Sequence, residues 1–353
     1  MAQAGDKQES NESAQPRGRR IFMGLVAAIA LLLLVGATYQ ALASAADRRN
    51  HPPPGEMIDI GGFEMHLYCT GEGSPTVILI TGASNNHAVW DPVQRAIETE
   101  TRVCSFDRAG LGWSDFDPSA ETMDDHVENL EALLQAAGES GPYIMVGHSI
   151  GGRQARAFTA RNRDDVVGVV LVDSTIEGQN NRFPAEIAEG GAGAVAFFGV
   201  CRALAPFGVI RLLNLGGAQA ESFETLSQEA KDQTRVIFHR TPICRGLQAD
   251  AAAAETITDA SDIQPHNLGD VPLIVLAAGL SPDEEAPGAF PDDMIPVFEE
   301  FKLISAELQR ELASLSTDSQ LIVAEESGHY IQTTQPDLVV SAIETLIASY
   351  ATD

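Results

Sequence analysis

A serine flanked by glycines is the most chemically suggestive feature of the chain. The residues Gly147-His-Ser-Ile-Gly151-Gly152 place Ser149 between an apolar segment that predicts a strand and a segment that predicts a helix. A G-x-S-x-G sequence in that context is typical of a nucleophile elbow, a strained turn that exposes the serine hydroxyl. The backbone N–H of Ile150 opens the helix and can donate a hydrogen bond to an oxyanion. Ser149 is therefore the candidate nucleophile.

A serine hydroxyl needs a base to take its proton, and the chain offers eight histidines. His329 lies in Ser327-Gly-His-Tyr330, after the last predicted strand and before the last predicted helix. That loop and the elbow belong to the same edge of a parallel sheet, so His329 is the candidate general base. His148 lies inside the elbow, and we expect it to pack beside Ser149.

The elements that must position these residues alternate along the chain. Apolar, β-branched runs predict strands at Met57–Ile60, Phe63–Tyr68, Thr76–Ile80, Arg102–Phe106, Tyr143–Val146, Val166–Val172, Pro272–Ala278 and Gln320–Ala324. Apolar residues at helical spacing predict helices at Met123–Ala137, Ile150–Arg161 and Pro336–Tyr350, the first of them capped by Thr122. This alternation predicts an α/β fold whose mostly parallel sheet is covered by helices on both faces.

The alternation stops between about residues 175 and 268. Helical patterns there cover Gly193–Leu213, Ala220–His239 and Arg245–Ala260. We expect these helices to form a cap over the carboxyl edge of the sheet, where open α/β sheets bind their ligands. Apolar side chains of the cap could form an acyl pocket or simply its core: Phe197, Phe198, Phe207, Phe223 and Phe238.

In these motifs and their order, the chain resembles the α/β-hydrolase superfamily, in its esterase- and lipase-like serine-hydrolase branch with a helical cap. The matching stretches are Thr81-Gly-Ala83, Asp107-Arg-Ala-Gly-Leu-Gly-Trp-Ser114, Gly147–Gly151, Val170-Leu-Val-Asp-Ser174 and Ser327-Gly-His-Tyr-Ile-Gln332. The resemblance implies an eight-stranded sheet in which only the second strand is antiparallel. It also implies an oxyanion hole formed by the N–H groups of Ala83 and Ile150, although Thr81-Gly82 stands where the family usually has His-Gly. No metal or organic cofactor is implied.

The resemblance further implies an acid that orients the histidine, and two aspartates are candidates. The family's usual position after the seventh strand reads Gly279-Leu-Ser-Pro-Asp283, one residue longer than its G-x-x-D pattern. Asp173 ends the sixth strand, where some members carry the acid. A charged side chain at the end of a buried strand needs a partner, so Asp173 is preferred and Asp283 is the alternative. Asp107 and Arg108, after the fourth strand, could contact substrate or brace the elbow.

The expected reaction is cleavage of a small carboxylic ester through an acyl-enzyme on Ser149. An aspartate at this position would have indicated a dehalogenase or an epoxide hydrolase instead. The same residues could also support an amidase, a lactonase, a carbon–carbon hydrolase or a cofactor-free haloperoxidase. A different class of protein, a ligand receptor that does not turn over, can use the same fold.

The four cysteines show no spacing typical of a zinc site. In the family's strand order the second and fourth strands are antiparallel neighbours, so Cys69 and Cys104 could face each other. Cys201 and Cys244 both fall in the cap. We predict the disulfides Cys69–Cys104 and Cys201–Cys244, with four buried thiols as the alternative.

The N-terminal region differs in character from the rest of the chain. We expect a disordered basic tail over residues 1–20, a transmembrane signal anchor over 21–42, a proline-rich linker over 43–55 and the hydrolase domain over 56–353. Arginines before the apolar run keep that end in the cytoplasm, which leaves the catalytic domain outside it. An Ala-x-Ala pattern ending at Ala43 leaves secretion after cleavage as the alternative.

The charge of the chain bears on its partners. Twenty-two basic and 50 acidic residues give a net charge of −28, which argues against a nucleic-acid partner. Residues 1–49 hold six basic and four acidic residues, so the remainder carries −30. We expect anionic lipid to repel this acidic body, which would stand off the membrane on its linker. No obligate protein partner is evident.

Overall fold

A computed structural model describes residues 15–117, 119–120, 122–188, 190–259 and 265–352. Eight strands form one sheet in the order β1-β2-β4-β3-β5-β6-β7-β8. Their bounds are Glu56–Asp59, Glu64–Thr70, Thr76–Ile80, Val103–Phe106, Tyr143–His148, Val166–Val172, Leu273–Ala278 and Ser319–Ala324 for β1 to β8. Strand β2 is antiparallel to both neighbours and the other pairs are parallel, which confirms the expected topology.

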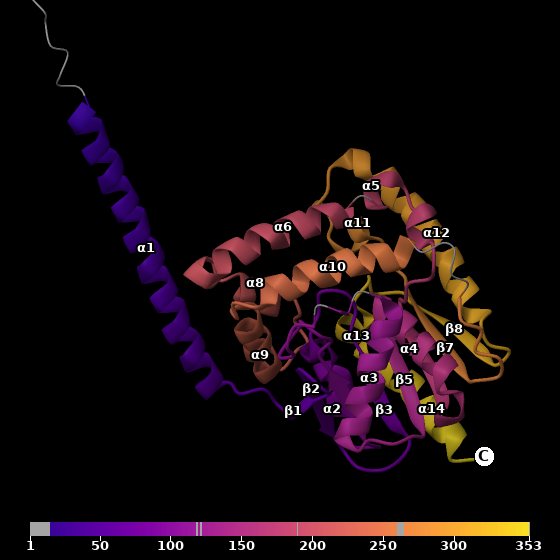
Figure 1. The fold of residues 1–353 in the computed structure, drawn as a ribbon. Coiled ribbons are helices and arrows are strands. Elements are labelled where there is room, and N and C mark those ends of the chain that lie inside the picture. Colours follow the sequence, from indigo (N-terminus) through magenta and orange to yellow (C-terminus); the bar gives the residue numbers. More distant parts are fainter. Residues whose placement is uncertain (1–14, 118, 121, 189, 260–264, 353) are drawn as a thin grey trace, which may run out of the picture.

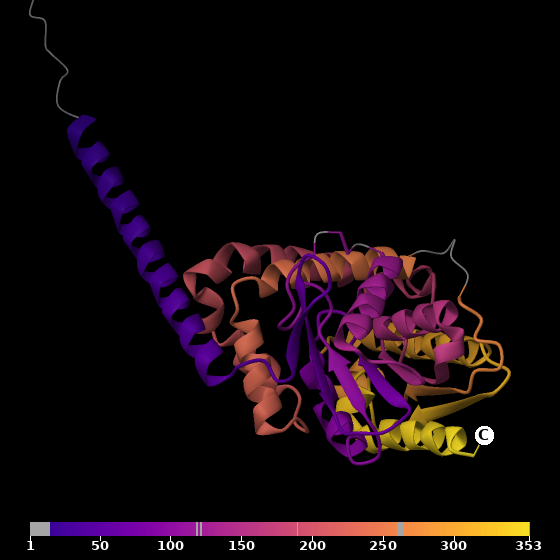
Figure 2. The same ribbon diagram turned by 60° about the horizontal axis from the view of Figure 1, so that its bottom comes forward.

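Helices cover both faces of the sheet (Figure 1, Figure 2). Residues of α3 (Met123–Ala137), α4 (Ile150–Arg161) and α12 (Ile295–Ala313) are buried in one core, and residues of α2 (Asp91–Ile97) and α14 (Pro336–Tyr350) in another. The predicted bounds of α3, α4, α14, β3 and β6 match the structure residue for residue. Local signals account for this agreement: Thr122, for example, forms a capping box with Asp125 at the start of α3.

The insertion between β6 and β7 forms the expected helical cap, with its own apolar core. Its helices are α5 (Ala185–Ala188), α6 (Gly190–Leu204), α7 (Val209–Leu212), α8 (Leu215–Glu221), α9 (Gln228–Phe238) and α10 (Ile243–Asp259). Two predicted helices are each divided. The first breaks after Leu204, because Pro206 lacks an amide hydrogen and Gly208 adopts a φ of 74°. The second breaks before Ser227, whose side chain caps α9.

Both predicted disulfides are present. Cys69 of β2 is paired with Cys104 of β4, its register partner across the antiparallel ladder. Cys201 of α6 is paired with Cys244 of α10, so this bridge joins two long cap helices.

The N-terminal helix is longer than predicted. Helix α1 runs from Gln15 to Asn50, so residues 15–20 of the expected tail and 43–50 of the expected linker are helical. Residues 1–14 of that tail lie outside the described residues. The segment after Leu42 contains alanines and no proline before Pro52, which explains why the helix continues. Among the described residues, Gly18–Asn50 and Ala185–Phe207 are long and apolar enough to cross a membrane, a test that signal sequences and core helices also pass.

Candidate active site

Ser149 occupies the turn between β5 and α4 in a strained conformation. Its φ is 54° and its ψ is −125°, a region that side chains other than glycine rarely adopt. Its N–H donates to the carbonyl of Val172 at the end of β6, at 3.1 Å. A Cβ atom on Gly147 would meet the backbone of Gly151 and Gly152, which lie just across the turn. The strain therefore lies at Ser149, whereas packing requires the glycine at position 147.

Asp173 and His329 come together at the neighbouring strand end. Asp173 Oδ2 lies 2.6 Å from His329 Nδ1, and Asp173 Oδ1 accepts the N–H of Ala278 at 3.1 Å. Asp173 has a φ of 38°, and its own N–H donates to Leu276 at 2.7 Å. The end of β7 thus holds both the backbone and the carboxylate of Asp173, and the carboxylate holds the imidazole.

The alternative acid, Asp283, has a different environment. It lies in the four-residue helix α11 (Pro282–Glu285), where it accepts a hydrogen bond from Ser281 Oγ at 2.8 Å. The neighbouring Glu284 pairs with Lys302 at 2.5 Å. Of the two aspartates, Asp173 is the one bound to His329.

The environment of His329 favours its charged form. Desolvation by the surrounding protein opposes the charge, but the hydrogen bond from Nδ1 to Asp173 and the charge of that carboxylate raise the pKa of His329 above its ordinary value. The imidazole remains 45% exposed. It lines a cavity of about 290 Å³ together with Ser149 and Asp173. The three candidate residues of the sequence therefore face one cavity.

His148 packs beside this group, as expected. Its ring centroid lies 4.5 Å from that of His329. Its Nε2 lies 2.9 Å from the backbone carbonyl of His329, which can only accept, so Nε2 carries the proton. Burial lowers the pKa of His148 well below its ordinary value. A neutral His148 therefore anchors the loop that carries His329.

The two candidate oxyanion donors lie on the expected elements. Ile150 is the first residue of α4, where the backbone N–H groups have no helical partner. Ala83 follows β3 in a loop that passes close to the elbow, because a Cβ on Gly82 would lie 3.1 Å from the Cβ of Ser149. Arg108 braces this loop by donating to the carbonyls of Thr81, at 2.5 Å, and Gly82, at 3.0 Å.

A second cavity of about 470 Å³ lies under the cap beside Ala83. Its lining is mostly apolar and includes Phe197, Phe198 and Phe238 of the cap and Tyr330, the neighbour of His329. Phe223 instead packs against the ring of Tyr330, at 5.1 Å between centroids. The cap phenylalanines thus divide between the pocket and the core.

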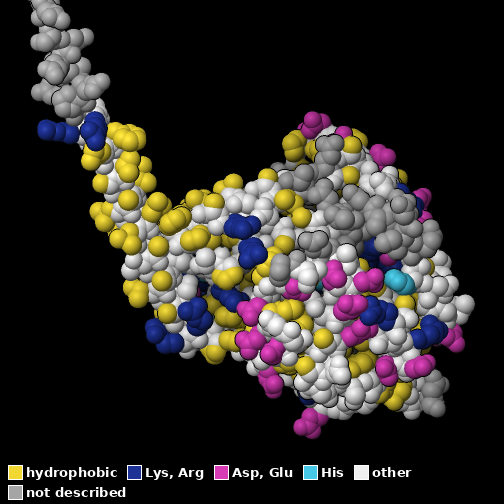
Figure 3. Space-filling view, viewed as in Figure 1, with side chains coloured by type: hydrophobic (Ala, Val, Ile, Leu, Met, Phe, Trp, Pro, Cys, Tyr) yellow, Lys and Arg dark blue, Asp and Glu magenta, His cyan; other side chains and the backbone are white. Residues whose placement is uncertain are grey.

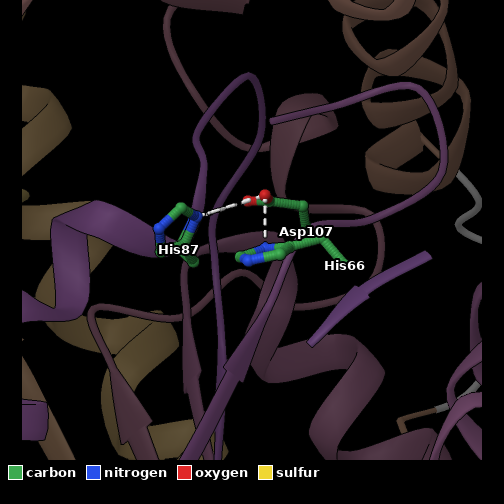
Figure 4. A group of neighbouring side chains, drawn as sticks. All are labelled: His66, His87 and Asp107. Carbon is green, nitrogen blue, oxygen red and sulfur yellow. Dashed lines mark hydrogen bonds and ion pairs between the residues drawn. The ribbon is translucent and has the colours of Figure 1, made fainter. Parts of the chain in front are cut away.

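Asp107, which follows β4, lies between two buried histidines, His66 and His87 (Figure 4). Asp107 Oδ2 lies 2.8 Å from His66 Nδ1 and 3.1 Å from His87 Nδ1. The same carboxylate accepts the N–H groups of His87, at 2.7 Å, and Trp113, at 2.9 Å. Burial opposes the charge of Asp107, but His87 and His66 hold its pKa well below its ordinary value. Asp107 therefore braces the loops that carry His87 and Trp113, and none of these contacts is with the elbow.

The same three side chains offer nitrogen and oxygen atoms within 4.8 Å of one another, a spacing that a metal ion could use. His66 Nε2 lies 2.5 Å from the carbonyl of Pro54. Both ring nitrogens of His66 thus face acceptors, and the Asp107 carboxylate already accepts several donors. A second such group contains Cys69 and Cys104, which are joined as a disulfide.

Sequence reasoning missed several residues around the site. Asp250 of α10 lies 2.8 Å from Arg108 Nη2 and accepts the N–H of Ser84 at 2.6 Å. It stands in an alanine-rich run with no local motif. His66 and His87 are likewise isolated in the sequence. Their only signal is burial, which appears once the strands are assembled.

Comparison with known proteins agrees with this architecture. The alpha/beta hydrolase fold family matches residues 75–336. An AB hydrolase superfamily protein of Gibberella zeae is 26% identical over 289 residues, which cover 77% of this chain and 86% of the relative. A 2-(acetamidomethylene)succinate hydrolase of Mesorhizobium japonicum is 24% identical over 300 residues, which cover 82% of this chain and 94% of the relative. A thermophilic esterase from Thermogutta terrifontis superposes with a TM-score of 0.52, at 22% identity, over 81% of this chain and 94% of that one. The chain belongs to the alpha/beta hydrolase fold family.

Proposed function

We propose that this protein is a serine hydrolase that cleaves a carboxylic ester through an acyl-enzyme on Ser149. The observation that carries the proposal is the 2.6 Å contact between Asp173 and His329 in the cavity that Ser149 also lines. A nucleophile, a base and an acid that orients the base are the parts that acyl transfer requires. The relative named as a hydrolase agrees with this class of reaction.

The proposed mechanism follows from the position of each group. Asp173 holds the Nδ1–H of His329, which leaves the Nε2 lone pair to take the proton of Ser149. Ser149 Oγ then attacks the ester carbonyl, and the N–H groups of Ile150 and Ala83 stabilise the oxyanion. His329 gives its proton to the departing alcohol. It next activates a water molecule, which releases the acid and restores the serine.

A fluorophosphonate probe and a p-nitrophenyl ester test this proposal on the detergent-solubilised full chain. We expect the probe to label Ser149 and the ester to be turned over many times. The Ser149→Ala variant should lose both signals, whereas Ser319→Ala, an exposed serine at the start of β8, should keep them. Labelling without turnover would favour a ligand receptor on this fold, and a labelled Ser149→Ala variant would contradict the assignment of the nucleophile.

We also propose that α1 is a single transmembrane anchor with its N-terminus in the cytoplasm and the catalytic domain outside it. Arg19 and Arg20 precede the apolar run, and two disulfides suit an oxidising compartment. Ala43 lies within a continuous helix that contacts the cap, which supports an uncleaved anchor over secretion after Ala43. Protease added to intact cells should digest the catalytic domain and leave the tail. A mature protein beginning near Ser44 would support the secreted alternative instead.

A further inference from the structure

Helix α1 is seated directly on the cap, with no spacer between them. Gln40 Nε2 donates to the carbonyl of His239 at 2.7 Å, and Asp47 forms an ion pair with Arg211 at 2.6 Å. Gly36 lies so close to the backbone of Phe207 that a Cβ atom would collide with it. The expectation that a linker holds the domain away from the membrane did not include this direct contact.

The position of this contact along α1 determines how deep the cap lies in a bilayer that α1 spans. A hydrocarbon core of about 30 Å requires about 20 helical residues, so a span that starts at Ile21 ends near Gln40. Gly36 lies inside that span and not beyond it. Because Gly36 touches Phe207, this corner of the cap reaches the level of the hydrocarbon in a membrane-inserted chain.

The cap carries exposed apolar side chains at this corner. Leu212 is 78% exposed and Leu213 is 63% exposed, and three further residues are exposed along α6 at helical spacing: Phe197, Val200 and Leu204. We call these five residues the apolar cap face. Figure 3 shows that the hydrophobic surface of α1 continues on to the neighbouring cap. Contiguous exposed surface of this kind marks an interaction site, and its neighbour here is the predicted span.

Basic residues accompany the apolar cap face on a molecule that is otherwise acidic. Arg48 and Arg49 are exposed at the end of α1, and Arg202 is exposed on α6. Lys and Arg side chains gather near the junction of α1 with the cap, whereas Asp and Glu are spread over the rest of the domain (Figure 3). Arginines beside an apolar face match the anionic headgroups that border a hydrocarbon core.

We propose that the apolar cap face is embedded in the bilayer beside α1, and that the cavity beneath it takes the acyl or alkyl chain of an ester dissolved in the membrane. Phe197 is exposed on this face and also lines the 470 Å³ cavity, which extends to Ala83 and Tyr330 beside the elbow. An apolar chain that enters from the lipid would thus reach Ala83, the candidate oxyanion donor beside the elbow of Ser149. The substrate part of this inference rests on the proposed function, and the docking surface does not.

Quenching by brominated lipid tests the docking surface. A tryptophan replaces Leu212 in the full chain, which is reconstituted in nanodiscs with phospholipid brominated near the headgroup end of its acyl chains. The matched control is Leu303→Trp, because Leu303 is 70% exposed on α12, far from α1 (Figure 1). The wild-type signal of the buried Trp90 and Trp113 is subtracted. We expect emission from Leu212→Trp to be lost and that from Leu303→Trp to persist. The proposal would be overturned if the emission of Leu212→Trp were the same in brominated and unbrominated lipid, as is expected for Leu303→Trp.

Hydrolysis of two esters tests the substrate class. The probes are a long-chain umbelliferyl ester dissolved in the nanodisc and a short, water-soluble p-nitrophenyl ester. Charged side chains are costly to bury in hydrocarbon, so Leu212→Asp/Leu213→Asp should lower hydrolysis of the long ester by about tenfold or more. Hydrolysis of the short ester should be unchanged, which shows that the variant folds. Equal hydrolysis of the long ester by variant and wild type would refute membrane delivery. If the wild type hydrolyses neither ester, the proposed function is refuted. The quenching result would still decide whether the apolar cap face is embedded in the bilayer.

Discussion

Arg108 and Asp250 form a buried ion pair that joins the cap to the loop beside the nucleophile. Their side chains are 4% and 7% exposed, and Arg108 Nη2 lies 2.8 Å from Asp250 Oδ1. Arg108 also holds the carbonyls of Thr81 and Gly82, and Asp250 holds the N–H of Ser84. The position of the candidate oxyanion donor Ala83 therefore depends on a residue from α10.

Removal of Asp250 should destabilise the protein strongly. In Asp250→Ala the Arg108 guanidinium stays buried without its counter-charge, a loss that costs about 3–5 kcal/mol. Chemical denaturation in detergent micelles measures the change. Asp250→Asn keeps an acceptor for Ser84 and should recover part of the loss. The control is Asp270→Ala, since Asp270 is 89% exposed in its pair with Arg163 and should contribute no more than about 1 kcal/mol. Equal effects of the two alanine variants would contradict this role.

The pH profile of ester hydrolysis should depend on Asp173. The base is neutral His329, and Asp173 raises its pKa, so wild-type kcat/KM should fall as the pH drops through a value above that of an ordinary histidine. In Asp173→Asn this acidic limb should move to lower pH. The plateau should drop by on the order of 10³–10⁴-fold, because the imidazole loses its orienting partner.

Asp283→Asn is the matched control for this measurement. Its carboxylate binds Ser281 and not His329, so both the plateau and the acidic limb should stay where they are in the wild type. The acid would be misassigned if the acidic limb of the pH profile moved in Asp283→Asn and stayed in place in Asp173→Asn.

The elbow should tolerate no side chain at Gly151. A Cβ there would lie 2.5 Å from the carbonyl oxygen of Ile80 and 2.6 Å from that of Thr81, so α4 and β3 would have to separate. We expect Gly151→Ala to lower stability by about 1–3 kcal/mol and to abolish fluorophosphonate labelling. Gly193→Ala is the comparison, because nothing lies within 4 Å of its Cβ position in α6. That variant should be as stable as the wild type or more so. A fully active Gly151→Ala protein would show that the elbow is looser than described.

The cap disulfide should contribute to the stability of the cap. Cys201 and Cys244 are 43 residues apart, and a loop of that length predicts about 3–4 kcal/mol from restriction of the unfolded chain. Cys201→Ala/Cys244→Ala should therefore unfold at lower denaturant concentration. Mass spectrometry after alkylation without reductant should find no modified cysteine in the wild type. Four alkylated cysteines there would contradict both bridges.

The chain sequence by itself determined the elements whose signals are local. Five elements were predicted with their bounds because apolar spacing and caps such as Thr122 act within a few residues. Ser149 and His329 became candidates because a glycine-flanked serine and a loop histidine occur at the same end of predicted strands. These features need no knowledge of how the strands are ordered.

Only the tertiary structure decided which distant residues meet. It placed Asp173 on His329, although the sequence left Asp283 open, because β6 and not the α11 turn ends beside the histidine loop. It also brought Asp250 to Arg108, which are 142 residues apart. The contact of α1 with the cap could not be predicted from hydropathy. It depends on the absence of a side chain at Gly36 and on one buried hydrogen bond from the Gln40 amide. Packing of this kind depends on the shapes of surfaces that exist only after folding.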